Sequence, residues 1–341
     1  DCGFNVAAPR EYAFPYLDAP EFNINDLDAV ILSHAHIDHC GCIPYLFKMG
    51  YRGPVYCSAP TRDVAALLCL DMIEIAMKEG SDPLYDSNDV KEMVKHTICL
   101  DYEEVSDITP DIRLTLYNAG HNLGSSLVHM HIGNGMHNFV YTGDFNYETS
   151  NLLGSASSRF PRLETVMMES TYGTRSDTSP TRKESEEELI RIINDTAEKN
   201  GKVLMPVLGV GRSQEIMLIL ERAMTEKRIP EMPIYVQGMV WDVTAIHTAY
   251  PDFLGARVKK AIFQRDHNPL LSPIFKKVVS QKEMQEIKDS KGPFIVMATS
   301  GMLTGGPSLS YFKHFAENPK NCVVLTSYQG VGSVGRRIQD G

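Results

Sequence analysis

Short apolar runs, each bounded by glycine, proline or polar residues, recur through the first half of the chain. Runs of this length are typical of buried strands, and they predict strands over 29–32, 55–57, 112–117, 126–132, 137–141 and 166–169. Apolar residues at helical spacing predict helices over 42–49, 61–77 and 89–96, the second of them capped by Thr61. Strands flanking helices in this order favour an α/β sandwich with its loops gathered along one edge.

The pattern changes after a stretch of glycine and hydroxyl residues at 173–181, which we interpret as a hinge. Helices and strands then alternate. The predicted helices are 185–199, 213–227, 242–250 and 309–315, and the predicted strands are 202–207, 233–236, 294–298 and 321–326. Repeated units of this kind require a parallel sheet. We therefore expect two domains, residues 1–178 and 179–341.

Three histidines and an aspartate follow the first predicted strand within six positions: His34, His36, Asp38 and His39. Side chains two apart in extended chain point the same way, so His34 and His36 can converge on one metal ion. Asp38 and His39 can face a second ion beside it. Imidazole and carboxylate ligands without thiolate suit a hydrolytic zinc site with one position open for water. The alternative is a polar loop with chance histidines, which this density of ligands disfavours.

Two later residues can complete a site for two zinc ions. His121 lies in a glycine-flanked loop between strands, and Asp144 follows the strand at 137–141. In the predicted site the first ion takes His34, His36 and His121, the second takes Asp38 and His39, and Asp144 bridges them. Two ions about 3.5–4 Å apart can share a hydroxide and act on a phosphodiester.

Supporting roles are predicted for residues around this site. Asp1 can accept a hydrogen bond from a metal ligand or water, or be a plain strand-end carboxylate. Glu169 can serve in acid–base chemistry, or simply be an exposed strand end. The remaining histidines, among them His129 and His247, are expected at the surface. Loop residues that can hold flanking phosphates are Ser125, Arg212, Ser213, Gly301 and Arg337, although glycine loops after strands are also common as plain turns.

Composition narrows the class of protein. The net charge of −10 argues against holding a polyanion by bulk charge, so any nucleic-acid contact must be local. The seven cysteines form no C-x-x-C pair, which favours reduced thiols in a cytoplasmic protein. No apolar run is long enough to cross a membrane, and no secretory pattern opens the chain. Asp1 is not expected to be a natural beginning, because no methionine precedes it.

The motif of His34, His36, Asp38 and His39, followed by His121 and Asp144, resembles the metallo-β-lactamase superfamily. Three further stretches, which cover Glu169–Gly173, Gly209–Glu215 and Thr299–Met302, resemble its β-CASP nucleases. The likeness covers nearly the whole chain and is greatest to archaeal factors of the cleavage and polyadenylation specificity type.

This resemblance implies an αββα sandwich, incomplete here, with a β-CASP domain of parallel α/β type and two zinc ions. It also implies endoribonuclease activity on single-stranded RNA, in 3′-end processing and transcription termination, and leaves 5′–3′ exonuclease activity open. Relatives carry KH domains ahead of the catalytic part, and the full-length protein is expected to form a homodimer and not to associate with membranes.

The sequence departs from the β-CASP pattern at two places. Arg337 stands where the family has a histidine, and the chain ends at Gly341 before a later histidine ligand of the second zinc. We therefore expect this chain to hold its second ion weakly and to cut RNA poorly. Other functions stay open from the sequence: a small-molecule hydrolase of the same superfamily, a catalytically silent RNA-processing scaffold, and a DNA nuclease.

Overall fold

The structure is a computed structural model that describes residues 1–5, 8, 10–174 and 180–341. The chain forms two compact units, residues 1–171 and 172–341. The predicted boundary at residue 178 lies outside the described residues.

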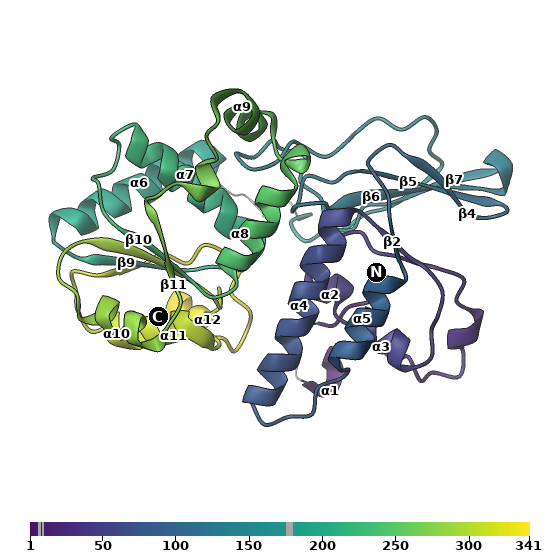
Figure 1. Ribbon diagram of the computed structural model, residues 1–341, viewed down its shortest axis with the longest axis horizontal. Coiled ribbons are helices and arrows are strands. Elements are labelled where there is room, and N and C mark those ends of the chain that lie inside the picture. Colours follow the sequence, from purple (N-terminus) through teal and green to yellow (C-terminus); the bar gives the residue numbers. More distant parts are fainter. Residues whose placement is uncertain (6–7, 9, 175–179) are drawn as a thin grey trace. The chain divides into compact units, whose positions relative to one another are not determined.

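The first unit contains two β-sheets (Figure 1). One is parallel, in the order β1-β2-β3, with β1 at Val30–Ile31, β2 at Val55–Cys57 and β3 at Thr97–Cys99. The other runs β4-β5-β6-β7-β8 and is antiparallel except for its last pair. Its strands are β4 Val105–Thr109, β5 Ile112–Asn118, β6 Ser126–Ile132, β7 His137–Tyr141 and β8 Thr165–Met167.

The two sheets pack against each other through a shared apolar core. Tyr56 of β2 lies in one buried cluster with Leu114 and Leu116 of β5 and Val128 of β6. On the five-stranded sheet, Leu127 and Val140 belong to a second cluster with residues of the following loops. The two-sheet core agrees with the predicted sandwich.

In the first unit one helix precedes β1, and the other four connect the strands of the parallel sheet. They are α1 Arg10–Ala13, α2 Ile37–Cys40, α3 Ile43–Lys48, α4 Ala59–Lys78 and α5 Ser87–Lys95. The prediction that Thr61 caps α4 is wrong: Ser58 is the cap and accepts the backbone N–H of Thr61. The helix starts earlier because Pro60 fits the first turn, where its missing N–H costs no helical hydrogen bond.

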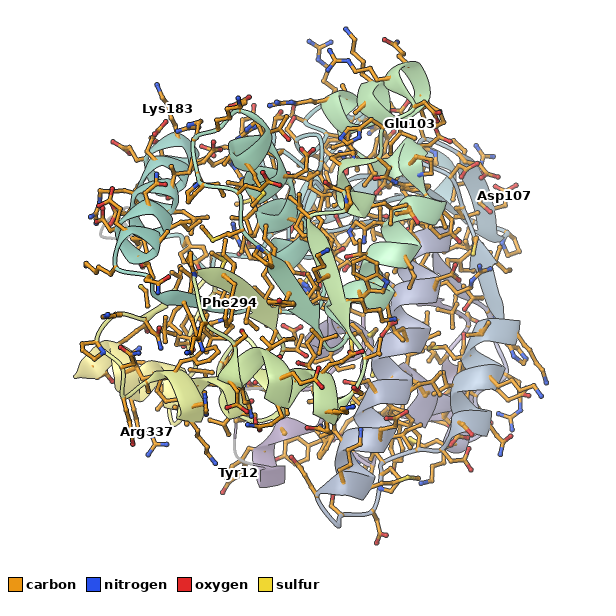
Figure 2. All side chains as sticks on the ribbon, turned by 60° about the vertical axis from the view of Figure 1, so that its left-hand side comes forward. Tyr12, Glu103, Asp107, Lys183, Phe294 and Arg337 are labelled. Atoms are coloured by element: carbon orange, nitrogen blue, oxygen red, sulfur yellow. The ribbon has the colours of Figure 1, made fainter. Side chains whose placement is uncertain are left out.

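The second unit is built on an all-parallel sheet in the order β11-β10-β12-β9-β13, as the alternating pattern predicted. Its strands are β9 Lys202–Pro206, β10 Ile234–Gln237, β11 Phe275–Val278, β12 Phe294–Ala298 and β13 Cys322–Val323. Its helices are α6 Arg182–Glu198, α7 Arg212–Thr225, α8 Val240–Ala249, α9 Ala256–Arg265, α10 Gln281–Asp289, α11 Gly306–Phe315 and α12 Val334–Asp340. Phe294, labelled in Figure 2, is buried in its core with Tyr311 and Phe315.

Several details differ from the prediction. The strand expected over 321–326 is reduced to Cys322–Val323. The short β11, with two lysines at its centre, gave no apolar run and was missed. His129 and His247, expected at the surface, are buried, and each imidazole donates a ring N–H to a backbone carbonyl, His129 to that of Arg162 and His247 to that of Val243. Among the described helices, none combines the length and apolarity needed to cross a membrane.

Candidate metal centre

The histidine stretch lies where β1 gives way to α2. His34 and His36 occupy extended chain after the strand, and His36 is the N-cap of α2, which carries Asp38 and His39. The backbone at Gly3 packs directly on this turn, since a Cβ at Gly3 would lie 2.0 Å from the carbonyl carbon and oxygen of Asp38. Strand, turn and N-terminal segment together fix four candidate ligands on one short piece of chain.

Four of the predicted ligands converge on one point. Ligand atoms of His34, His36, His121 and Asp144 lie within 4.8 Å of one another. Nε2 of His121 is 3.1 Å from Nδ1 of His36 and 3.5 Å from Oδ2 of Asp144. Nε2 of His34 is 3.9 Å from the same carboxylate oxygen. Three imidazoles and one carboxylate at this spacing can bind one metal ion.

The other carboxylate oxygen of Asp144 faces a second group. Its Oδ1 lies 3.5 Å from Nε2 of His39, and that nitrogen lies 3.8 Å from Oδ2 of Asp38. One oxygen of Asp144 is therefore turned toward the first cluster and the other toward His39 and Asp38. This is the geometry that a carboxylate bridging two ions requires.

Asp1 also lies close enough to His34 and His39 to be considered as a ligand. Its carboxylate, however, already accepts hydrogen bonds from the backbone N–H and hydroxyl of Ser33 (2.7 and 2.6 Å) and from the hydroxyl of Tyr141 (2.8 Å). It lies 2.8 Å from Nδ1 of His39 as well. These contacts engage both oxygens of Asp1, one at Oδ1 and three at Oδ2, so Asp1 is better suited to orient ligands than to bind a metal.

The electrostatics of the cluster suit a cation. Burial lowers the pKa of His34 well below its ordinary value, and the neighbouring imidazoles lower it further, so the ring is neutral. Within the part of the chain that the structure describes, its buried Nε2 has no hydrogen-bond partner. Burial raises the pKa of Asp144; His39 opposes this, and the charges of Asp38 and Glu169 add to it. A buried nitrogen lone pair beside crowded carboxylates fits a bound cation, and the nitrogen and oxygen donors match zinc.

The loop that carries His121 is held from inside. The Ser125 hydroxyl accepts the backbone N–H groups of His121 and Asn122, each at 3.1 Å, and Ser125 is fully buried. The prediction that Ser125 contacts a phosphate is wrong, because its side chain is fully buried and exposes no atom to solvent. Its hydroxyl shapes the ligand loop instead.

Glu169 lies just beyond β8, beside the cluster. Its backbone N–H donates to the Thr142 hydroxyl at 3.3 Å, and its Oε2 accepts the N–H of Thr171 at 2.8 Å. Because Thr142 is two residues before Asp144, this bond places Glu169 near the Asp144 carboxylate, whose pKa the charge of Glu169 helps to raise. The second carboxylate oxygen of Glu169 has no hydrogen bond of its own in the described part of the chain.

In the second unit, the glycine-rich loops meet at the carboxyl edge of the parallel sheet. A Cβ at Gly301 would lie 3.0 Å from the backbone nitrogen of Leu208 and 3.1 Å from the hydroxyl of Ser327, so the loops after β9, β12 and β13 touch. Arg212 and Arg337 are exposed, and Arg337 projects from α12 in Figure 2. Ser213 is fully buried and donates to the Gly209 carbonyl, so the phosphate contact predicted for it is wrong.

Two residues of the metal centre escaped the sequence analysis. Ser33 links Asp1 to His34, and Tyr141 donates to Asp1. Ser33 could have been found from its position directly before His34. Tyr141 carries no such signal, because only the pairing of β7 with its neighbours brings its hydroxyl to Asp1.

A two-sheet α/β unit with a histidine–aspartate cluster on its strand-end loops defines the metallo-β-lactamase class of fold, whose members are metal-dependent hydrolases. A family model for the metallo-beta-lactamase superfamily domain matches residues 1–171, and one for the Beta-Casp domain matches residues 213–338. The chain belongs to the metallo-β-lactamase superfamily and carries a β-CASP domain, as its motifs indicated.

Similar proteins are found among archaea. Proteins named transcription termination factor FttA from Methanocaldococcus jannaschii and Thermococcus kodakarensis are each 53% identical over 100% of this chain and 54% of their own length. The FttA of a Lokiarchaeum strain is 50% identical over 99% of this chain and 53% of its own. The chain thus spans about half the length of the curated relatives it matches.

Proposed function

We propose that this chain is the catalytic part of a zinc-dependent ribonuclease that cuts phosphodiesters of single-stranded RNA, in 3′-end processing and transcription termination. The observation that carries the proposal is the Asp144 carboxylate, whose two oxygens face two separate imidazole groups. The names of the relatives support the role in termination. Seven free cysteines are consistent with a cytoplasmic protein.

In this proposal His34, His36 and His121 would hold one zinc ion, and Asp38 and His39 a second, with Asp144 between them. When bound, the two ions would lower the pKa of water and stabilise charge that develops at phosphorus. Asp1 keeps the Nδ1 side of His39 occupied, so that Nε2 faces the metal position. Burial of His34 keeps water from competing for its nitrogen.

Glu169 has the proton-transfer role in this proposal. The Thr171 N–H holds one of its oxygens, which leaves the other to take a proton from the attacking water and pass it to the departing 3′ oxygen. In the second unit, the exposed guanidinium groups of Arg212 and Arg337 and the backbone amides around Gly301 would bind flanking phosphates.

The test is a zinc assay paired with cleavage of matched single-stranded RNA and DNA by the full-length protein. We expect two zinc ions per chain and preferential cutting of RNA. The double variant Asp38→Ala/His39→Ala should abolish cleavage and lower zinc content. Asp101→Ala/His137→Ala removes the same residue types from exposed positions of the first unit and serves as the control.

Four outcomes would contradict the proposal. Retained cleavage in a metal-free preparation of Asp38→Ala/His39→Ala would refute the mechanism. Equal cutting of DNA and RNA would refute the proposal that RNA is the preferred substrate. Full zinc content with no nuclease activity, but with hydrolysis of a small thioester or lactam, would assign the chain to small-molecule hydrolysis. Full zinc content with neither activity would indicate a scaffold.

A further inference from the structure

Helix α9 of the second unit has an unusual charge pattern. It contains four basic residues, Arg257, Lys259, Lys260 and Arg265, and no acidic one. Other helices of this unit pair their cations internally: on α6 Arg191 pairs with Glu188 and Asp195, and on α12 Arg336 pairs with Asp340. In a chain with a net charge of −10, such a cationic segment is a local exception.

The cations of α9 are not used inside the protein. Lys259 donates to the Asp252 carbonyl at 3.3 Å, which fixes its stem but leaves its charge unneutralised. Among the described residues, Arg257, Lys260 and Arg265 form no ion pair, and all three are exposed. Only Val258 of this helix is buried. The helix therefore packs on its unit along one face, and its other faces are open to solvent. Figure 1 shows α9 at the periphery of the second unit.

A large aromatic side chain lies among these cations. Phe263 is 61% exposed, although a phenylalanine gains most when it is buried. At 3.6 residues per turn, Arg257, Lys260 and Gln264 share the outward face, and Phe263 lies next to Lys260. Cations that follow a phosphate backbone beside an aromatic ring on which a base can stack are the elements of a single-stranded nucleic-acid site.

We propose that the outward face of α9 binds single-stranded RNA, with Arg257 and Lys260 on phosphates and Phe263 stacked on a base. The choice of RNA rests on the proposed function, because the substrate proposed there is single-stranded RNA, which is a polyanion. An acidic protein segment could satisfy the cations but offers no planar base for Phe263. The site shares no residue with the glycine-rich loops at the carboxyl edge of the sheet.

The experiment measures binding of fluorescein-labelled oligouridylate by fluorescence anisotropy, over a series of salt concentrations. The full-length protein carries Asp38→Ala/His39→Ala throughout, so that the RNA is not cut. Arg257→Glu/Lys260→Glu is compared with Lys282→Glu/Lys291→Glu, which makes the same charge change at exposed positions of the second unit. Circular dichroism checks that both variants fold.

The two kinds of contact have different expected signatures. Losing two phosphate contacts should weaken binding about tenfold or more and reduce the slope of log affinity against log salt by about 1.4. Phe263→Ala should weaken binding by a factor between about 5 and 150 and leave the salt slope unchanged, because stacking releases no counterions. The control pair should change both quantities less than the α9 pair.

The inference is overturned if the α9 pair binds RNA as the control pair does, or if polyglutamate competes for α9 as well as oligouridylate does. The α9 proposal can be wrong while the proposed function is right. The protein without the Asp38 and His39 substitutions would then still cleave RNA and bind zinc. Conversely, a protein that binds RNA through α9 but does not cut it would contradict the proposed function and leave this site standing.

Discussion

The Ser33 hydroxyl lies 3.0 Å from Nδ1 of His34 while it donates its single hydrogen to Asp1 at 2.6 Å. Toward His34 the hydroxyl can therefore act only as an acceptor, and Nδ1 must carry the ring hydrogen. This leaves the lone pair of His34 on Nε2, which points at the Asp144 carboxylate 3.9 Å away. Asp1 thus orients His39 directly and His34 through Ser33.

Ser33→Ala should lower zinc affinity at the site of His34. The change removes the acceptor for a fully buried N–H, and outer hydrogen-bond partners of metal ligands are typically worth about 10–100-fold in affinity. Competition with a metal chelator would measure the loss, and the absorption of the cobalt-substituted protein would report the changed ligand geometry. Ser33→Thr keeps the hydroxyl and is expected to rescue binding. Unchanged affinity in Ser33→Ala would exclude this role.

Gly3→Ala should disrupt the metal centre from outside it. A methyl group at Gly3 would lie 2.0 Å from the backbone of Asp38, so the turn carrying Asp38 and His39 must shift. Overpacking of this kind costs about 1–3 kcal/mol, and zinc content should fall with it. Gly305→Ala is the control, because its Cβ would meet open space at an extended φ of 178°. Normal zinc content in Gly3→Ala would show that the turn carrying Asp38 and His39 accommodates the added methyl group.

Removal of metal should destabilise the first unit. A ligand bound only by the folded state stabilises it by about 2.7 kcal/mol at a free concentration 100 times its dissociation constant. Calorimetry of zinc-loaded and chelator-treated protein would measure the shift. Fluorescence of Trp241, the only tryptophan, follows the second unit as an internal reference and should shift less. Identical transitions with and without chelator would argue against a structural contribution of the metal.

The second unit should lose stability as the pH falls below neutrality because of His247. Burial lowers the pKa of this residue on α8 to about 4, against an ordinary value of 6.5. Between these values the unfolded chain binds a proton that the folded chain does not, so stability is complete above about 6.5 and declines toward pH 4. The loss amounts to roughly 3 kcal/mol at about 1.4 kcal/mol per pKa unit.

Urea unfolding followed by Trp241 fluorescence between pH 7 and pH 4 would measure this decline, since Trp241 and His247 lie on the same helix. His247→Gln should flatten the pH dependence, whereas the exposed His267→Gln should leave it unchanged. An equally steep decline in His247→Gln would assign the pH dependence to other groups.

Much of the fold followed from local pattern. Strands Ser126–Ile132 and His137–Tyr141 have the predicted bounds, because a short apolar run bounded by polar residues or glycine marks a buried strand in the sequence itself. The parallel sheet of the second unit followed from its alternation of helix and strand. Prediction failed at β11, where lysines occupy the centre of a short edge strand, and at His247, because burial of a single histidine depends on neighbours far apart in sequence.

The sequence by itself determined the chemical type of the centre, since imidazoles and carboxylates within one short turn after a strand have few uses other than metal binding. Only the tertiary structure decided how they act together. It brought His121 and Asp144 to the turn, aimed the two oxygens of Asp144 at different groups, and gave Asp1 four hydrogen bonds. It also buried Ser125 and Ser213, which the sequence had offered to phosphates. The reason is physical: a side chain's helix or strand fixes in broad terms where it points, but its partner is set by the packing of segments that lie between 32 and 140 residues apart.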